Sequence, residues 1–200
     1  MLSRAHARGL TLIELMVTIT LVGIMLVLAM PGVGDWIANS RVRSTGDEIQ
    51  NGLRLARVEA MNRNRTVAFV RTSATPALNA TPSATGSNWY VQVLPLNAVE
   101  GADAAFQNTA FVQGGSFSNL SRATVNGDAV LCFNSVGRVV DNSSTGLGAN
   151  CVAPTDALVP KQINVTFTTA SRSLRAEVFL GGRVRMCDPA AAAGQPNACT

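Results

Sequence analysis

Apolar and polar positions divide the chain into three zones. The first is an almost wholly apolar run of 21 residues from Leu10 to Met30, which includes a carboxylate at Glu14. At about 1.5 Å per residue, a helix of this length spans about 30 Å, the thickness of a bilayer core. Residues 1–9 carry Arg4 and Arg8, which favours the cytoplasmic side for this end. The first zone therefore predicts a single membrane helix.

The second zone has the repeat of an amphipathic helix. The segment Pro31–Gly34 is expected to break or bend the first helix, and Asp35 can cap a second helix. The opposite face of the second helix carries mostly arginine, which is typical of a solvated face. The apolar positions recur at steps of about 3.5 as far as about Asn64, at Val42, Ile49, Leu53, Ala56 and Ala60.

The third zone, from Thr66 onward, has short alternating segments separated by polar turns, the pattern of β-strands. Apolar residues alternate with other residues from Ile163 to Phe167 and again in Leu174–Leu180. The short turn Ala170–Ser173 joins these two segments, which predicts a hairpin. The strands we expect are Thr66–Arg71, Trp89–Leu94, Ala129–Phe133, Arg138–Val140, Ile163–Thr169, Leu174–Leu180 and Arg183–Cys187.

Two parts of the third zone are not expected to form regular structure. The stretch Ser73–Ser87 is rich in Thr, Ala, Pro and Ser and predicts a flexible loop, and residues 95–122 show no clear pattern. The whole pattern predicts an α+β protein in which a long N-terminal helix packs on a C-terminal antiparallel β-sheet domain.

Composition suits one globular domain with an apolar appendage, since 47% of residues are hydrophobic and 14% are charged. The formal net charge is +4, and among the 16 basic residues only Lys161 is lysine. This excess of arginine is compatible with an oxyanion partner, because the guanidinium binds carboxylate and phosphate in a fork; a GC-rich genome is the alternative reason. Removal of residues 1–9 would lower the charge to +2, so basicity could matter only in a local patch.

The cysteines and the single histidine limit the kinds of metal or catalytic site that we expect. The four cysteines form two close pairs, Cys132 with Cys151 and Cys187 with Cys199, without the spacing of a zinc site. An even number favours disulfides in an exported chain. Three connectivities are possible, and we expect the local one because each pair closes a loop rich in Gly, Asn, Ala and Pro. His6 is the single histidine. We expect no catalytic residue, no cofactor and no metal site.

The N-terminal zone resembles the type III signal of prepilins and pseudopilins, and the match rests on RGLTLIELM at residues 8–16. The resemblance implies cleavage by prepilin peptidase after Gly9 and methylation of Leu10, where the usual residue is Phe. It also implies that Glu14, the fifth mature residue, pairs with the N-terminal amine of a neighbouring subunit during assembly. A carboxylate in an apolar run is costly without such a partner; the alternative is that Glu14 stays hydrated near the membrane interface.

A second resemblance, to the GspH/FimT group of minor pilins and minor pseudopilins, rests on Leu53–Ala60, Arg63 and the strand Thr66–Arg71. It implies a type IV pilin-like fold. The domains expected are a leader at 1–9, a transmembrane and assembly helix at 10–30, its amphipathic continuation at 31–65 and a β domain at 66–200. The function implied is a minor type IV pilin at or near the pilus tip, first in the inner membrane and then in an extracellular pilus. The alternative is a minor pseudopilin of a type II secretion system, in a periplasmic pseudopilus.

A third resemblance concerns Gly182-Arg183-Val184-Arg185, which is similar to a Gly-Arg-x-Arg motif of FimT-type pilins that bind DNA during natural transformation. On a strand, Arg183 and Arg185 share one face and could meet successive phosphates of double-stranded DNA. Arg138 follows Gly137 in a similar turn and could extend the patch. The alternative is an ordinary hairpin whose exposed face carries arginine.

Overall fold

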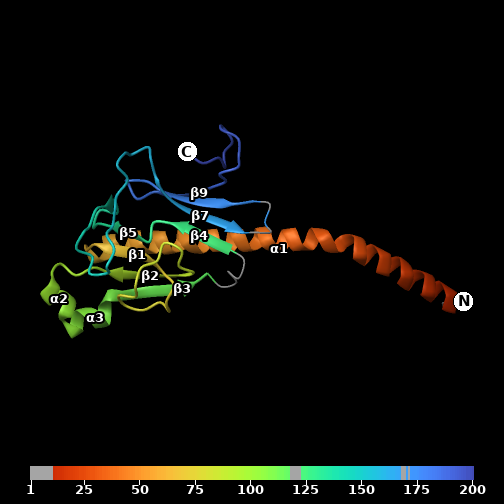
Figure 1. Cartoon of the computed structure of the whole chain (residues 1–200), viewed down its shortest axis with the longest axis horizontal. Coiled ribbons are helices and arrows are strands. Elements are labelled where there is room, and N and C mark those ends of the chain that lie inside the picture. Colours follow the sequence, from red (N-terminus) through yellow and green to blue (C-terminus); the bar gives the residue numbers. More distant parts are fainter. Residues whose placement is uncertain (1–10, 118–122, 168–169, 171) are drawn as a thin grey trace, which may run out of the picture.

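The computed structural model describes residues 11–117, 123–167, 170 and 172–200, with the backbone alone for residues 28–33 and 123. A long helix, α1 (Leu12–Arg63), lies along two antiparallel sheets, with strand orders β3-β2-β1-β5-β6 and β4-β7-β8-β9 (Figure 1). The predicted α+β class is confirmed. The strands are β1 (Val67–Thr72), β2 (Asn88–Val93), β3 (Phe111–Ser116), β4 (Ala123–Gly127), β5 (Val130–Phe133), β6 (Val139–Val140), β7 (Lys161–Phe167), β8 (Leu174–Val178) and β9 (Val184–Cys187).

Helix α1 is 52 residues long and has a cap at each end. The side chain of Thr11 accepts a hydrogen bond from the Glu14 N–H at 3.3 Å, as expected of a threonine at an N-cap. At the other end Asn64 adopts the left-handed conformation with φ of 52°, and its N–H bonds back to Ala60 and Met61. Asparagine tolerates this conformation better than most residues, so the chain can turn here from the helix into β1.

The segment Pro31–Gly34 was expected to break or bend the helix, and α1 continues through it without a break; Asp35 lies inside α1 rather than capping a second helix. A proline removes one N–H and crowds one carbonyl, which a helix can absorb by bending. Figure 1 shows such a change of direction in the part of α1 nearer the N-terminus. The two predicted helical zones are therefore one continuous helix.

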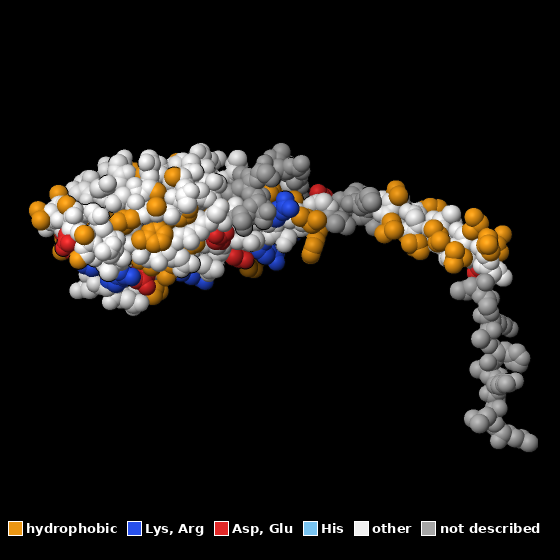
Figure 2. Space-filling view, turned by 90° about the horizontal axis from the view of Figure 1, so that it is seen from below, with side chains coloured by type: hydrophobic (Ala, Val, Ile, Leu, Met, Phe, Trp, Pro, Cys, Tyr) orange, Lys and Arg blue, Asp and Glu red, His pale blue; other side chains and the backbone are white. Residues whose placement is uncertain are grey.

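The first part of α1 stands clear of the sheets (Figure 1). Large apolar side chains are exposed all along it, from Leu12 at 78% to Val27 at 67%, and they colour this arm orange in Figure 2. Within the described residues, no helix meets the length and apolarity required of a membrane span. The predicted span 10–30 lies partly outside them, at Leu10 and at the side chains of residues 28–30.

The second part of α1 supplies one face of the core. The five apolar residues predicted for this face are all buried. They pack in one cluster with side chains from both sheets, such as Phe69 of β1, Val91 of β2 and Ile163 of β7. Arg41, Arg43 and Arg54 lie exposed, as expected of a solvated face. The periodicity read from the sequence thus identifies how α1 docks.

The seven strands expected from the sequence all form, with ends that shift by up to two residues. The hairpin predicted between the last long alternating segments is confirmed, because β7 pairs with β8 antiparallel. Strands β3 and β4 were not predicted, nor were the short helices α2 (Ala98–Ala102) and α3 (Ala104–Ala110). Three of these four elements fall in residues 95–122, where the sequence shows no clear pattern.

Candidate functional site

The residues predicted for processing and assembly lie at the start of the chain. Gly9 and Leu10 fall outside the residues that the structure describes. Glu14 lies in the exposed first turn of α1, where its N–H donates to the Thr11 side chain. A carboxylate at this end of a helix is favoured by the helix dipole. Within the part of the chain that the structure describes, Glu14 forms no ion pair.

The predicted DNA-binding motif begins in a tight turn between β8 and β9. The Gly182 N–H donates to the Phe179 carbonyl at 2.7 Å, and the Phe179 N–H donates to the Arg183 carbonyl at 3.0 Å. Gly182 has φ of +75°, a conformation that disfavours any side chain. Arg183 leaves this turn exposed, with its guanidinium carbon 4.2 Å from the centre of the Phe179 ring. Stacking on an aromatic ring restrains the guanidinium without neutralising its charge.

A second turn of the same construction joins β5 to β6. The Gly137 N–H donates to the Asn134 carbonyl at 2.8 Å, and the Asn134 N–H donates to the Arg138 carbonyl at 2.9 Å. Gly137 also has φ of +75°, and the exposed residue that follows it is again an arginine, Arg138. Residues 134–138 and 179–183 thus form twin turns, each of which ends in Gly-Arg.

The twin turns lie against each other. The Val139 N–H, just after the first turn, donates to the Leu180 carbonyl of the second at 3.0 Å. Gly182 packs directly on Gly137, and a Cβ added to Gly182 would collide with the Gly137 carbonyl oxygen. The structure therefore brings Arg138 and Arg183 into neighbouring turns, as the sequence suggested they could be.

Arg185 is placed differently from Arg183. Its Nη2 donates to Glu177 Oε2 at 2.9 Å and to the Ala198 carbonyl at 3.1 Å. Glu177 is fully buried and also accepts from the Thr200 N–H and hydroxyl. The charge of Arg185 is therefore used inside the protein to neutralise a buried carboxylate. The two arginines of the motif do not form a matched pair of free side chains.

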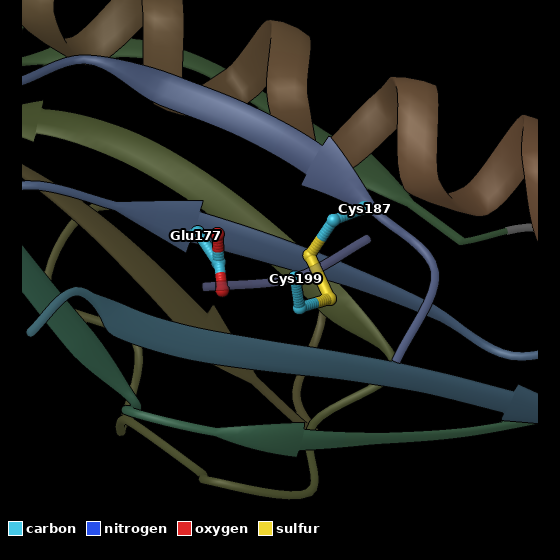
Figure 3. Close-up of side chains that lie close together, drawn as sticks. All are labelled: Glu177, Cys187 and Cys199. Atoms are coloured by element: carbon cyan, nitrogen blue, oxygen red, sulfur yellow. A yellow bond between two sulfur atoms is a disulfide. The ribbon is translucent and has the colours of Figure 1, made fainter. Parts of the chain in front are cut away.

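The disulfides follow the local pairing that we expected, Cys132 with Cys151 and Cys187 with Cys199. The second one lies beside Glu177 and holds the C-terminal segment against β9 (Figure 3). Glu177, Cys187 and Cys199 are close enough to form a metal-binding group, but both thiols are consumed in the disulfide. This cluster is better described as a clamp on the C-terminal segment than as a metal site.

Two family models match the chain. The model of the type II transport protein GspH matches residues 45–182, more than half of the chain. The prokaryotic N-terminal methylation motif matches residues 4–30. No curated protein matches the sequence significantly.

Among solved structures, the chain is similar to two crystal forms of the type IV minor pilin FimU of Pseudomonas aeruginosa. One has 14% identity and a TM-score of 0.46, over 76% of this chain and 98% of that one; the other has 13% and 0.47, over 78% and 96%. The minor pseudopilin EpsH of the Vibrio cholerae type 2 secretion system has 9% identity and a TM-score of 0.45, over 76% of this chain and 99% of that one.

Proposed function

We propose that this chain, which belongs to the GspH family, is a minor pilin that takes its place at or near the tip of a type IV pilus. The observation that carries the proposal is the apolar arm of α1, whose large side chains are 51% to 78% exposed from Leu12 to Val27. An exposed apolar surface of this extent needs a partner, which a bilayer provides before assembly and other subunits provide afterwards. The arm therefore suits a protein that moves from the inner membrane into a filament.

The N-terminal methylation motif supports the same route. Prepilin peptidase would cut after Gly9, and the new N-terminus at Leu10 would be methylated. In the filament, the Glu14 carboxylate would pair with the N-terminal amine of a neighbouring subunit, since two opposite charges in an apolar setting cost less together than apart.

Replacement of Glu14 tests this assembly role. Glu14→Ala should leave cleavage intact and strongly reduce the amount of the protein in sheared filaments, because the neighbouring amine loses its counter-charge. Mass spectrometry of the mature N-terminus and immunoblots of the sheared fraction give the two measurements. Gly9→Val is the control that should block processing itself. Normal incorporation of the Ala variant would count against the pairing.

We also propose that the twin turns bind double-stranded DNA through its phosphates. Arg138 and Arg183 are exposed, lie in adjacent turns and form no ion pair within the described residues. Contacts of this kind bind without sequence preference and weaken steeply with salt. Gly182 and the Arg185–Glu177 pair would hold the second turn in place. Aromatic residues make up only 5% of the chain, so stacking on single-stranded bases is not the expected mode.

A gel-shift titration of the full chain in detergent with a short duplex tests this site. Arg183→Ala should weaken binding to all sequences alike and lower the slope of log K against log salt by about one. Replacing both Arg183 and Arg185 would also destabilise the fold, which would confuse the measurement of binding. The single variant Arg183→Ala is therefore the informative one. Equal binding by the wild type and Arg183→Ala would show that the assignment is wrong.

A second candidate function is that of a minor pseudopilin in a type II secretion system. It is favoured by the description of the matching family, which is that of a type II transport protein. Deletion of the gene distinguishes the two candidates, since loss of twitching or transformation supports the pilus, and loss of protein export supports the secretion system.

A further inference from the structure

A third arginine, Arg57 of α1, packs against both of the twin turns. A Cβ added to Gly137 would lie 3.0 Å from Arg57 Nε, and one added to Gly182 would lie 3.1 Å from the same atom. Met61, one helical turn further on, also touches Gly137. The absence of side chains at the two glycines is therefore what lets α1 bring a guanidinium to the junction of the turns.

Arg57 has no counter-ion or acceptor in the part of the chain that the structure describes. The Nε atom of Arg57 is buried and makes no hydrogen bond, although Arg57 as a whole is partly exposed. The nearby arginines of α1 and its C-cap region behave differently, because Arg63 pairs with Glu59 and Arg65 pairs with Glu100. Arg65, Arg71 and Arg185 also have a buried Nε without a hydrogen bond, but their terminal nitrogens donate to acceptors. The terminal nitrogens of Arg57 have no such acceptor among the described residues, so its charge is available to an oxyanion.

We infer that Arg57, Arg138 and Arg183 form one phosphate-binding site, in which Arg57 is a direct ligand and Arg185 is a positioning residue. The inference rests on the proposed DNA binding and changes which side chains carry it. Arg57 Nε lies at the junction of the twin turns, and Arg138 and Arg183 each directly follow one of the two glycines that it contacts. None of the three arginines forms an ion pair with a carboxylate of the described residues. Arg185 instead holds β8 to β9 and the C-terminal segment through Glu177.

The competing role for Arg57 is packing alone, in which its aliphatic stem covers the glycine turns and its charge is incidental. The two roles predict different effects on DNA binding when Arg57 is replaced by a neutral residue of similar length. Packing predicts a change in stability without a specific change in phosphate contacts. A ligand role predicts the loss of one phosphate contact, which the salt dependence of binding reports.

The experiment measures duplex DNA binding by the full chain in non-ionic detergent, between about 50 and 200 mM salt. Arg57→Gln should weaken binding several-fold and lower the slope of log K against log salt by about one. Arg54→Gln is the matched control, because Arg54 is exposed on the same helix and is not among the nearest neighbours of Gly137 or Gly182. It should leave the slope unchanged. Arg185→Gln, studied where it remains folded, should also keep the wild-type slope.

The outcomes separate the inference from the proposed function. If the wild type binds no duplex, the proposed DNA binding fails. If the wild type binds and Arg183→Gln weakens it, while Arg57→Gln behaves like Arg54→Gln, the inference about Arg57 is overturned and DNA binding stands. Should Arg57→Gln lose its thermal transition, Arg57→Met keeps the packing stem without the charge. A folded Arg57→Met with the wild-type slope would overturn the inference as well.

Discussion

Arg183 and Arg185 are two residues apart, yet their surroundings give them different energetic roles. Arg183 is exposed and contacts the face of Phe179, an interaction of about 0.5–1 kcal/mol at such a site. Arg185 neutralises Glu177, which is fully buried and receives further hydrogen bonds from Thr200. Removal of one partner of a buried ion pair leaves a charge without compensation, so the two residues should differ most in stability.

We expect Arg185→Ala to lower the free energy of unfolding by about 3 kcal/mol, because it leaves the Glu177 carboxylate buried and unpaired. Urea unfolding of the full chain in detergent, followed by tryptophan fluorescence, measures this. Arg183→Ala is the matched control and should stay within about 1 kcal/mol of the wild type. Equal midpoints for the two variants would contradict the assignment.

The sequence could identify part of this site. Gly182 and Arg183 stand out as a glycine turn followed by a cation, and Glu177 can be read as the cross-strand partner of Arg185 once the turn is placed. The contact between Gly137 and Gly182 could not be predicted, because no local periodicity relates two turns in different sheets. Arg57 was missed for the same reason, since on its helix it looks like one more residue of the charged face.

At the scale of elements, the segment whose structure was hardest to predict from the sequence is the connection between β2 and β3, which contains α2 and α3. Its helices are too short to show a period, and α2 has no buried residue that would mark a face. Polar contacts help to hold this segment in place. Glu100 accepts hydrogen bonds from both Nη groups of Arg65, at 3.0 and 2.7 Å, and from the Leu96 N–H at 2.7 Å. Arg63 adds a bond to the Thr109 carbonyl at 2.9 Å.

This anchoring should depend on pH. The hydrogen bonds from Arg65, and then the one from the Leu96 N–H, lower the pKa of Glu100. A lowered folded-state pKa contributes stability that is present above the ordinary pKa of glutamate and is lost as pH falls through the folded value. We expect amide exchange protection around α2 to decrease in acid, below the normal range of glutamate. Glu100→Gln should lack this dependence, and an identical acid profile in that variant would rule out Glu100 as its cause.

The long helix shows where a local rule is overridden by the element around it. The segment Pro31–Gly34 suggested a break or bend, yet α1 continues through it. The apolar periodicity from Val42 onward identifies the face of α1 that the two sheets cover. Among the described residues, burial of α1 begins at Ala38, beyond the proline, so the helix passes Pro31 by giving up one backbone hydrogen bond and changing direction.

At the scale of the whole molecule, two kinds of contact join the two sheets and α1 into one domain. The shared apolar core joins all three, and Arg71 of β1 adds a polar link between the sheets. Its buried guanidinium donates to the carbonyls of Val125 and Gly127 in β4 and to that of Gly86 in the loop before β2. Burial lowers the pKa of Arg71 to about 10, an effect that the negative charge of Asp128 opposes.

Replacement of Arg71 should therefore uncouple the sheets rather than merely loosen one strand. Arg71→Met keeps the volume and avoids the desolvation of a charge, but it leaves the Val125 carbonyl and two weaker acceptors without their donor. The lost charge-assisted bonds should outweigh the relieved desolvation, so we expect a net destabilisation of about 2 kcal/mol.

Trp89 reports on the first sheet, and amide exchange of β7 and β8 reports on the second. In the wild type the two urea transitions should coincide, and in Arg71→Met the second sheet should open first, because it loses its polar attachment to β1. Coincident transitions at the wild-type midpoint would mean that the apolar core alone unites the domain.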